Sequence, residues 1–119
     1  MENARRLREL LRRPGVVVAV GAHDALSACL IERAGFDAIW ASGFAISAAQ
    51  FAMPDASLLT MTENREAIKQ IRCATNLPII ADCNNGYGNA INVMRTVVEY
   101  EATGVAAISL EDNERKSKH

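Results

Sequence analysis

The sequence predicts an α/β fold of parallel strands, and two observations support that prediction. Segments with helical spacing of apolar residues alternate along the chain with short, continuously apolar runs. Two helix-to-strand junctions also have similar sequences, AGFDAIW at 34–40 and TGVAAIS at 103–109. Each consists of a helix end, a glycine and a buried strand. Several βα units therefore follow one another within 119 residues.

The first elements are a helix and a strand. Leucines at 7, 10 and 11 predict a short amphipathic helix over 3–13, which Pro14 and Gly15 end. The run VVVAVG at 16–21 is rich in β-branched residues, which is typical of a strand covered on both faces.

The second unit begins at Asp24, which can cap a helix over 25–34. The apolar positions of this helix are Leu26, Cys29, Leu30 and Ala34. Gly35 ends it, and DAIWAS at 37–42 is the second strand. A long connection rich in Ser, Ala and Phe follows, with a turn at 53–55.

The later part of the chain repeats the alternation twice. Thr60 and Glu63 have capping-box spacing and open a helix that runs through about residue 74. LPIIAD at 77–82 is the third strand, and VAAISLED at 105–112 is the fourth. Between them lies a helix that Asn89 can cap, with apolar residues on one side: Ile91, Met94, Val97 and Val98.

Composition limits the function classes. With 13 basic and 14 acidic residues and 50% apolar residues, the chain is expected to be one soluble globular unit. Its basic clusters lack interleaved aromatic residues, so we expect no nucleic-acid partner, and no apolar stretch predicts a membrane span. Three cysteines without metal-ligand spacing favour a reducing, cytoplasmic location.

Polar residues gather at the predicted carboxyl ends of the strands, where ligands bind in parallel α/β folds. The second strand ends at Ser42 and Gly43, the third ends at Asp82, and the fourth ends at Glu111 and Asp112. Together with Asn84, the three acids offer hard oxygen donors that suit Mg²⁺ better than zinc.

The turn that follows Asp82 points to an anionic ligand. Gly86-Tyr87-Gly88 permits close backbone approach, and the helix start at Asn89 offers amides to an anion. A metal beside an anion site suggests a phosphate or carboxylate substrate.

Each of these residues also has a purely structural interpretation, which the sequence leaves open. Asp82 can order its loop or cap a helix, and Asp112 can hydrogen-bond its own loop. Tyr87 and Trp40 can be packing residues.

Three long segments carry a family resemblance: GAHDALSACLIERAGFDAIWASGF, PDASLLTMTENREAIKQI and LPIIADCNNGYGNAINVMRTVVEYEATGVAAISLED. Over roughly residues 15–113 they resemble the N-terminal half of phosphoenolpyruvate mutases, within the isocitrate lyase/phosphoenolpyruvate mutase superfamily. The resemblance implies the first half, about four βα units, of a TIM-type (β/α)₈ barrel. It also implies a Mg²⁺-dependent isomerase of phosphonate biosynthesis that interconverts phosphoenolpyruvate and phosphonopyruvate by forming a carbon–phosphorus bond.

The resemblance implies site roles by motif. Asp82 would be the principal metal-side carboxylate, Asn84 a further oxygen donor, and Glu111 a second acid acting through a water of the metal. Asp55, in the PDA turn, resembles an active-site acid. The WASGF segment would contact the small phosphorylated or phosphonate pyruvyl substrate through Trp40, Ser42, Gly43 and Phe44.

The chain departs from the family pattern at two places. The family motif is usually D-x-D-T-G, whereas this chain has Asp82-Cys-Asn84-Asn85-Gly86. Asn84 in place of the second acid removes one negative charge from the metal site. After EDNE the family continues into a gating loop, whereas this sequence reads RKSKH. We therefore expect a truncated member with an N-terminal helix at 1–14, a partial barrel at 15–112 and a divergent basic tail at 113–119.

A half barrel exposes two strand edges and the helix faces that the other half would cover. Pairing as a homo-oligomer or with another chain is therefore expected. Three alternatives to the mutase remain: phosphonopyruvate hydrolase, a carbon–carbon lyase of the superfamily, and a non-catalytic half-barrel remnant. The lyase branch that cleaves methylisocitrate-like acids is expected to be less similar. Its members usually carry a catalytic cysteine in a KRCGH-like loop, which this sequence lacks, and their turn seldom reads GYGN.

Overall fold

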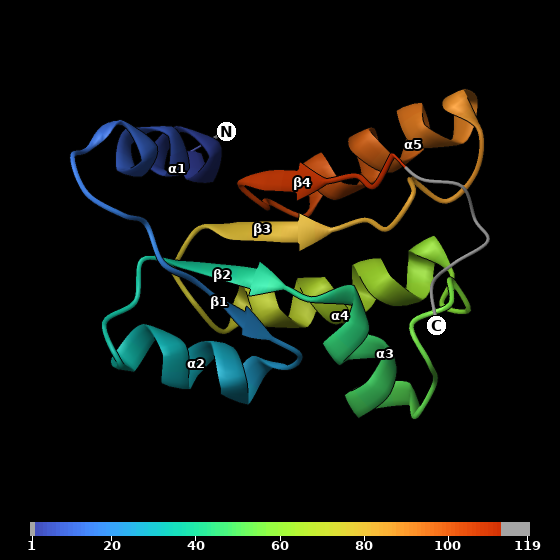
Figure 1. Ribbon diagram of the computed structural model, residues 1–119, viewed down its shortest axis with the longest axis horizontal. Coiled ribbons are helices and arrows are strands. Elements are labelled where there is room, and N and C mark those ends of the chain that lie inside the picture. Colours follow the sequence, from blue (N-terminus) through green and yellow to red (C-terminus); the bar gives the residue numbers. More distant parts are fainter. Residues whose placement is uncertain (1, 113–119) are drawn as a thin grey trace.

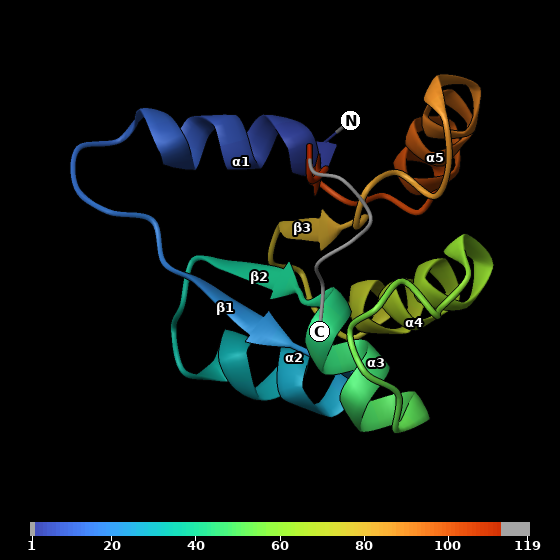
Figure 2. The ribbon, with the colours of Figure 1, turned by 45° about the vertical axis from the view of Figure 1, so that its right-hand side comes forward.

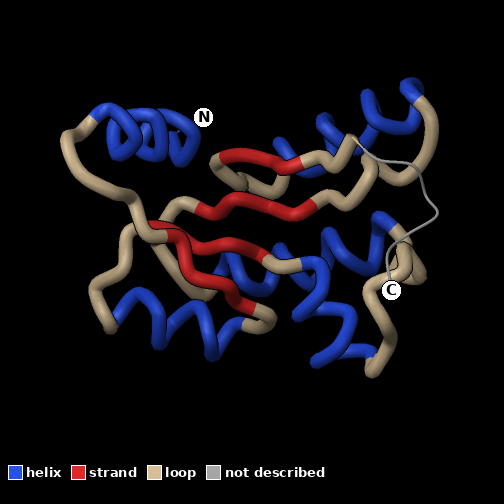
Figure 3. Tube along the Cα trace, in the orientation of Figure 1, coloured by secondary structure: helices blue, strands red, loops and turns tan. Residues whose placement is uncertain are grey.

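The computed structural model describes residues 2–112, in which four parallel strands alternate with helices (Figure 1). The elements in chain order are α1 Glu2–Arg12, β1 Ala19–Ala22, α2 Ala25–Arg33, β2 Ala38–Ala41, α3 Gly43–Phe51, α4 Met61–Cys73, β3 Ile79–Asp82, α5 Ala90–Ala102 and β4 Ala107–Ser109. The sheet order is β1-β2-β3-β4, and the strands lie side by side (Figure 3). The predicted parallel α/β class is confirmed. The predicted tail at 113–119 lies outside the described residues.

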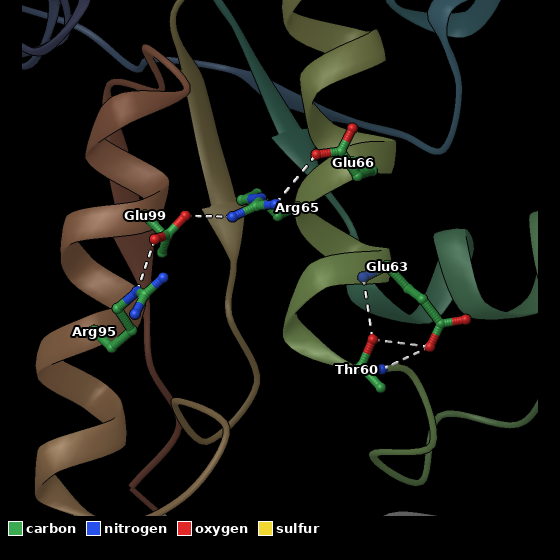
Figure 4. Close-up of polar contacts among 6 residues, drawn as sticks. All are labelled: Thr60, Glu63, Arg65, Glu66, Arg95 and Glu99. Atoms are coloured by element: carbon green, nitrogen blue, oxygen red, sulfur yellow. Dashed lines mark hydrogen bonds and ion pairs between the residues drawn. The ribbon is translucent and has the colours of Figure 1, made fainter.

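Side-chain caps fix where three of the helices begin, as predicted. Asp24 Oδ1 accepts a hydrogen bond from the Ser27 backbone N–H at 2.8 Å and so caps α2. At α4, Thr60 Oγ1 accepts from the Glu63 N–H at 3.2 Å, while Glu63 Oε1 accepts from the Thr60 N–H at 3.0 Å (Figure 4). Asn89 makes the equivalent reciprocal pair with Asn92 at the start of α5.

The core lies between the sheet and the helices of one face. Ile39 of β2 and Ile79 of β3 are fully buried in one cluster with Ile68 and Ile71 of α4. Each such side chain contributes about 1.5–3 kcal/mol by leaving water. Helices α2 and α4 lie together on this side of the sheet (Figures 1 and 2).

Helix α1 lies apart from α2 and α4 (Figure 2). The Asn3 side chain donates to the carbonyl of Gly104 at 2.8 Å, and Arg6 donates to the carbonyl of Asn76 at 2.5 Å. These carbonyls precede β4 and β3, so α1 is fastened at the amino ends of these strands, opposite the predicted site.

Two predictions about the first half of the chain were wrong. The 16–21 run is not a strand covered on both faces: β1 begins at Ala19, and Val16 and Val18 are 87% and 44% exposed. Val16 and Val18 precede β1 in the chain, and within the strand only Ala22 is buried. The connection after β2 contains α3, which its alanines favour and the Ser42 side chain caps.

The apolar sides noted for two helices do not face the sheet. Leu26 and Leu30 of α2 are 67% and 55% exposed, while Ala28 and Ile31 are buried instead. On α5 the exposed residues are Ile91, Met94, Val97 and Val98, and the buried ones are Thr96 and Tyr100. Among residues 2–112, these helix faces are exposed and β1 and β4 are the edge strands of the sheet, as expected for a half barrel. Within residues 2–112, no helix is both long and apolar enough to cross a membrane.

Candidate functional site at the carboxyl ends of β2 and β3

The site begins where β2 passes into α3. Ser42 is the N-cap of α3, since its Oγ accepts a hydrogen bond from the Ala45 N–H at 3.2 Å. The next residue, Gly43, is buried, and its N–H donates to Asp82 Oδ2 at 3.1 Å. The predicted residues of two neighbouring strand ends are therefore in direct contact.

Asp82 is the last residue of β3 and organises the loop after it. Besides the bond from Gly43, its Oδ1 accepts from the Asn84 N–H at 3.0 Å. Its carbonyl oxygen accepts from the Asn64 side-chain amide at 3.1 Å. The loop-ordering interpretation of Asp82 thus holds. It leaves the metal interpretation open, because a carboxylate oxygen has lone pairs beyond the one that each N–H uses.

Asn84 brings a second oxygen to the same place. Its backbone has φ of 50°, an uncommon conformation for a residue with a side chain. Its Nδ2 donates to the Tyr87 hydroxyl at 3.4 Å, whereas its buried Oδ1 has no hydrogen-bond partner among residues 2–112. An unsatisfied buried oxygen is costly and calls for a ligand or other partner.

Gly43 is the point on which the two oxygens converge. A Cβ at this position would lie 2.9 Å from Asp82 Oδ2 and 3.2 Å from Asn84 Oδ1. Any larger residue would therefore crowd both oxygens, which gives a physical reason for glycine in the WASGF segment.

This donor set fits a hydrated magnesium ion. Mg²⁺ commonly takes one or two carboxylates and keeps several waters, so a carboxylate beside an amide oxygen suffices in type and number. Across residues 2–112, no group of three or more His, Cys, Asp or Glu side chains could hold a metal. A site of that kind, as a zinc ion would favour, is not found in the described part of the chain.

The backbone of Glu111 is hydrogen-bonded to the backbone of Asn84. Its N–H donates to the carbonyl of Asn84 at 2.7 Å, and the N–H of Cys83 donates to the carbonyl of Ser109 at 3.0 Å. These bonds continue the β3–β4 pairing beyond the strands. They bring partly buried Glu111 beside the Asp82 loop, and exposed Asp112 follows it.

Three other predicted site residues lie outside the contacts described above. Trp40 is partly buried in β2 and points to the opposite sheet face from Ile39. Phe44 is 61% exposed on α3, and Asp55 lies partly exposed in the segment between α3 and α4. Their roles as substrate contacts and active-site acid stay predictions.

The turn after the site has the backbone freedom predicted for it. Gly86, Tyr87 and Gly88 have φ of 90°, 65° and 146°, all in the region that glycine favours. Burial raises the pKa of the Tyr87 phenol, so this hydroxyl is neutral and can both accept and donate a hydrogen bond. Asn89 Oδ1 accepts from the N–H groups of Ile91 and Asn92, so the cap already occupies two of the amides considered for an anion.

The sequence reasoning missed two buried polar residues below the site, Asn64 and Tyr100. Asn64 of α4 is 1% exposed and donates to both the Asp82 carbonyl and the Tyr100 hydroxyl. A signal was available, because Asn64 stands at helical spacing on the same face as the apolar residues Ala67, Ile68 and Ile71. For Tyr100 no such signal was available, because the apolar residues of α5 lie on its exposed side and not on the side that carries Tyr100.

Comparisons with known proteins agree on one family. A family model described as phosphoenolpyruvate phosphomutase matches residues 7–119. The 2,3-dimethylmalate lyase of Eubacterium barkeri is 52% identical over 112 residues, which are 94% of this chain and 39% of the lyase.

Solved structures give the same answer. A phosphoenolpyruvate phosphomutase from Streptomyces platensis subsp. rosaceus aligns with a TM-score of 0.88 at 52% identity, over 92% of this chain and 38% of that chain. A phosphonopyruvate hydrolase in complex with oxalate and Mg²⁺ aligns with a TM-score of 0.91 at 41% identity, over 98% and 41%. The chain thus spans about two fifths of the length of these relatives. A 2,3-dimethylmalate lyase and a mutase reach the same 52% identity, so identity alone does not separate the lyases from the mutases.

Proposed function

This chain belongs to the phosphoenolpyruvate phosphomutase family, and we propose that it carries the magnesium-binding part of an active site for small pyruvyl acids. Its four parallel strands and the helices between them are the first half of a TIM-type barrel, in agreement with its coverage of the full-length relatives. In such barrels the active site lies at the carboxyl ends of the strands.

One observation carries the proposal. Asp82 Oδ2 and the unpartnered Asn84 Oδ1 converge beside Gly43, at the carboxyl ends of two central strands. Two hard oxygens in a partly buried position favour a hydrated divalent cation, and the hydrolase relative was crystallised with Mg²⁺ and oxalate, a small dicarboxylate.

The reaction that we propose is the interconversion of phosphoenolpyruvate and phosphonopyruvate. Bound Mg²⁺ would supply positive charge that stabilises a pyruvyl enolate. Asp82 holds its orientation through two backbone N–H bonds, from Gly43 and Asn84. We propose that Ser42 and Gly43 contact the substrate. We propose Glu111 as a second acid on the neighbouring strand. Asn84 in place of an acid lowers the negative charge, which favours an anionic substrate and weakens metal binding.

Two other activities of the family are the second candidates. Cleavage of a 2,3-dimethylmalate-like acid is supported by the 52% identity to the lyase, and hydrolysis of phosphonopyruvate by the similarity to the hydrolase structure. A non-catalytic half barrel is the remaining alternative. Each of the two edge strands, β1 and β4, has one side that is unpaired within residues 2–112, and this favours pairing with a further half barrel in every case.

The test is ³¹P NMR of phosphonopyruvate incubated with the purified chain and Mg²⁺. Conversion of the phosphonate signal to phosphoenolpyruvate would support the mutase, whereas inorganic phosphate would identify the hydrolase. Consumption of 2,3-dimethylmalate in a parallel incubation would identify the lyase. No turnover of any substrate by folded protein would overturn the catalytic proposal for this chain.

Two variants make the assay specific. Asp82→Ala removes the carboxylate at the centre of the site and should abolish both turnover and Mg²⁺ binding. Glu101→Ala removes an exposed acid near the end of α5 and should change neither. Equal losses in both variants would point to general destabilisation rather than to a metal site.

A further inference from the structure

A buried amide group from α4 reaches the end of β3. The side chain belongs to Asn64, which is 1% exposed, and its Nδ2 carries two hydrogens. Nδ2 donates to the hydroxyl oxygen of Tyr100 at 2.8 Å and to the backbone carbonyl oxygen of Asp82 at 3.1 Å. A helix that otherwise packs through apolar residues is thereby bonded to the central residue of the candidate site.

The pairing of β2 with β3 shows what is unusual about the bond to Asp82. Ile39 lies opposite Ile79, and the Ile39 N–H donates to the carbonyl of Pro78 at 2.9 Å. In a parallel pair the donors of one strand recur at every second residue. Continued at that spacing along β2, the ladder would have the Gly43 N–H donating to the carbonyl of Asp82.

The structure replaces this bond of the ladder by two others. The Gly43 N–H donates to the Asp82 side chain, at Oδ2, instead of to its backbone carbonyl. The carbonyl oxygen accepts from Asn64 of α4. Asn64 therefore takes the place of a strand donor, and the Gly43 N–H is left to hold the carboxylate.

This exchange of partners matters for the candidate site. The Asp82 carboxylate is held from two segments, by Gly43 at 3.1 Å and by the Asn84 N–H at 3.0 Å. Without Asn64 the Asp82 carbonyl would lose its bond to α4, and a buried acceptor without a partner is costly. The strand register then supplies the Gly43 N–H as its donor, and Oδ2 of the carboxylate would lose that bond.

We propose that Asn64 is a positioning residue of this site, which binds the Asp82 carbonyl so that the Gly43 N–H orients the Asp82 carboxylate. Tyr100 holds the Asn64 amide in place through the bond to its hydroxyl. The inference rests on the proposed function only for its metal, because the acceptor that Gly43 uses is a property of the metal-free protein.

The first experiment identifies that acceptor. Scalar coupling across a hydrogen bond, measured by NMR in metal-free protein, shows to which carbon the Gly43 amide nitrogen is coupled. In wild type we expect the side-chain carboxylate carbon of Asp82. In Asn64→Leu, which removes the amide from the helix, we expect the backbone carbonyl carbon of Asp82. Coupling to the carboxylate carbon in both proteins would overturn the proposal.

The second measurement is the Mg²⁺ dissociation constant, by titration calorimetry. Asn64→Leu should weaken binding about tenfold, the lower range for loss of a group that orients a metal ligand. Thr75→Val is the matched control: Thr75 is 5% exposed, and its hydroxyl donates to Glu32 at 3.1 Å, near the amino end of β3. The control should change neither the coupling nor the Mg²⁺ affinity. Equal weakening in both variants would contradict a positioning role.

A double variant separates positioning from general stability and also serves if Asn64→Leu does not fold. Asn64→Leu with Tyr100→Phe removes both partners of the 2.8 Å bond, and an apolar pair in place of a hydrogen-bonded pair can be nearly neutral for stability. The Asp82 carbonyl still lacks its amide donor, so the changed coupling and the weak Mg²⁺ binding should persist. Recovery of Mg²⁺ affinity together with stability would overturn the proposal.

Failure of the two proposals can be told apart. Wild-type protein that binds no Mg²⁺ would contradict the proposed function, and the role of Asn64 would then be decided by the coupling of Gly43 in metal-free protein.

Discussion

The two faces of the sheet differ sharply in how far they are covered. On the face toward α2 and α4, Ile39, Ala41, Ile79 and Ala81 are all 0% exposed. On the other face, the aligned residues Gly21, Trp40, Ile80 and Ala107 are exposed or partly exposed. Because successive residues of a strand point to opposite faces, the same four strands provide both surfaces.

The difference shows which part of a barrel wall these residues complete on their own. In a (β/α)₈ barrel the helix-facing residues pack within each half, whereas the inward-facing residues of all eight strands fill the interior together. The described residues therefore build the outer layer of the wall, and their inner layer is open. The candidate site lies at the carboxyl edge where both faces meet, held by bonds among residues 43, 82 and 84.

The largest expected effect tests this difference directly. Ile39→Ala should lower the free energy of unfolding by about 2–5 kcal/mol, since it leaves a cavity in the covered core. Ile80→Ala, one residue along β3 from buried Ile79, should cost much less, because its side chain is partly exposed. Urea unfolding of both variants measures the contrast. Equal losses would mean that the open face is covered in solution, by a second copy or by another chain.

Two glycine substitutions, with smaller expected effects, compare the candidate site with the open face of the sheet. Gly43→Ala should destabilise the protein by about 1–3 kcal/mol, because the new methyl group would crowd Asp82 and Asn84. Gly21→Ala adds the same methyl group on the open face of β1 and should stabilise the protein by up to about 1 kcal/mol. Apart from the two chain neighbours of Gly21, no atom of residues 2–112 lies within 4 Å of that methyl position. Thermal unfolding measures both. Loss of stability in Gly21→Ala would show that the inner face is not open.

The covered face was also the more predictable one. Strand positions, helix caps and the parallel order follow from local patterns, since Asp24, Thr60 and Asn89 cap helices wherever the neighbouring backbone is helical. Asp82, Gly43 and Asn84 came together as predicted because parallel strands end at one edge.

What the sequence could not predict depends on packing between distant segments. The sequence places the apolar residues Ile91, Met94 and Val98 on one side of α5, yet in the structure that side is exposed and Tyr100 is buried. Periodicity identifies the apolar side of a helix, but it does not tell which neighbour that side contacts. The Asn64–Tyr100 bond joins residues 36 positions apart, so no local pattern indicates it.

A moderate effect is expected at the start of α4, which covers β2 and β3. Thr60→Ala removes the hydroxyl that accepts from the Glu63 N–H, and should cost about 1 kcal/mol of stability. Thr62→Ala makes the same chemical change at an exposed position inside the helix and should be neutral or slightly stabilising. Urea unfolding that shows the two variants to be alike would mean that the cap does not hold α4 in place.

The smallest effect concerns the ion pairs that join α4 and α5. Glu99 accepts hydrogen bonds from Arg95, at 2.7 Å, and from Arg65 of α4 (Figure 4). Arg65 also forms an ion pair with Glu66. The hydrogen bond from Arg95, followed by the positive charges of Arg95 and Arg65, lowers the pKa of Glu99.

A lowered pKa means that Glu99 stabilises the fold fully above the ordinary glutamate value of about 4.3, and that this contribution is lost as the pH falls through the lowered value. Glu99→Gln should therefore be slightly less stable than wild type at pH 7, with the difference shrinking as the pH is lowered below about 4. Denaturant unfolding across this pH range measures the change, and added salt should reduce it. Glu101→Gln, on the same helix, is the matched control. A difference that stays constant with pH would show that α4 and α5 are held together by packing and not by these charges.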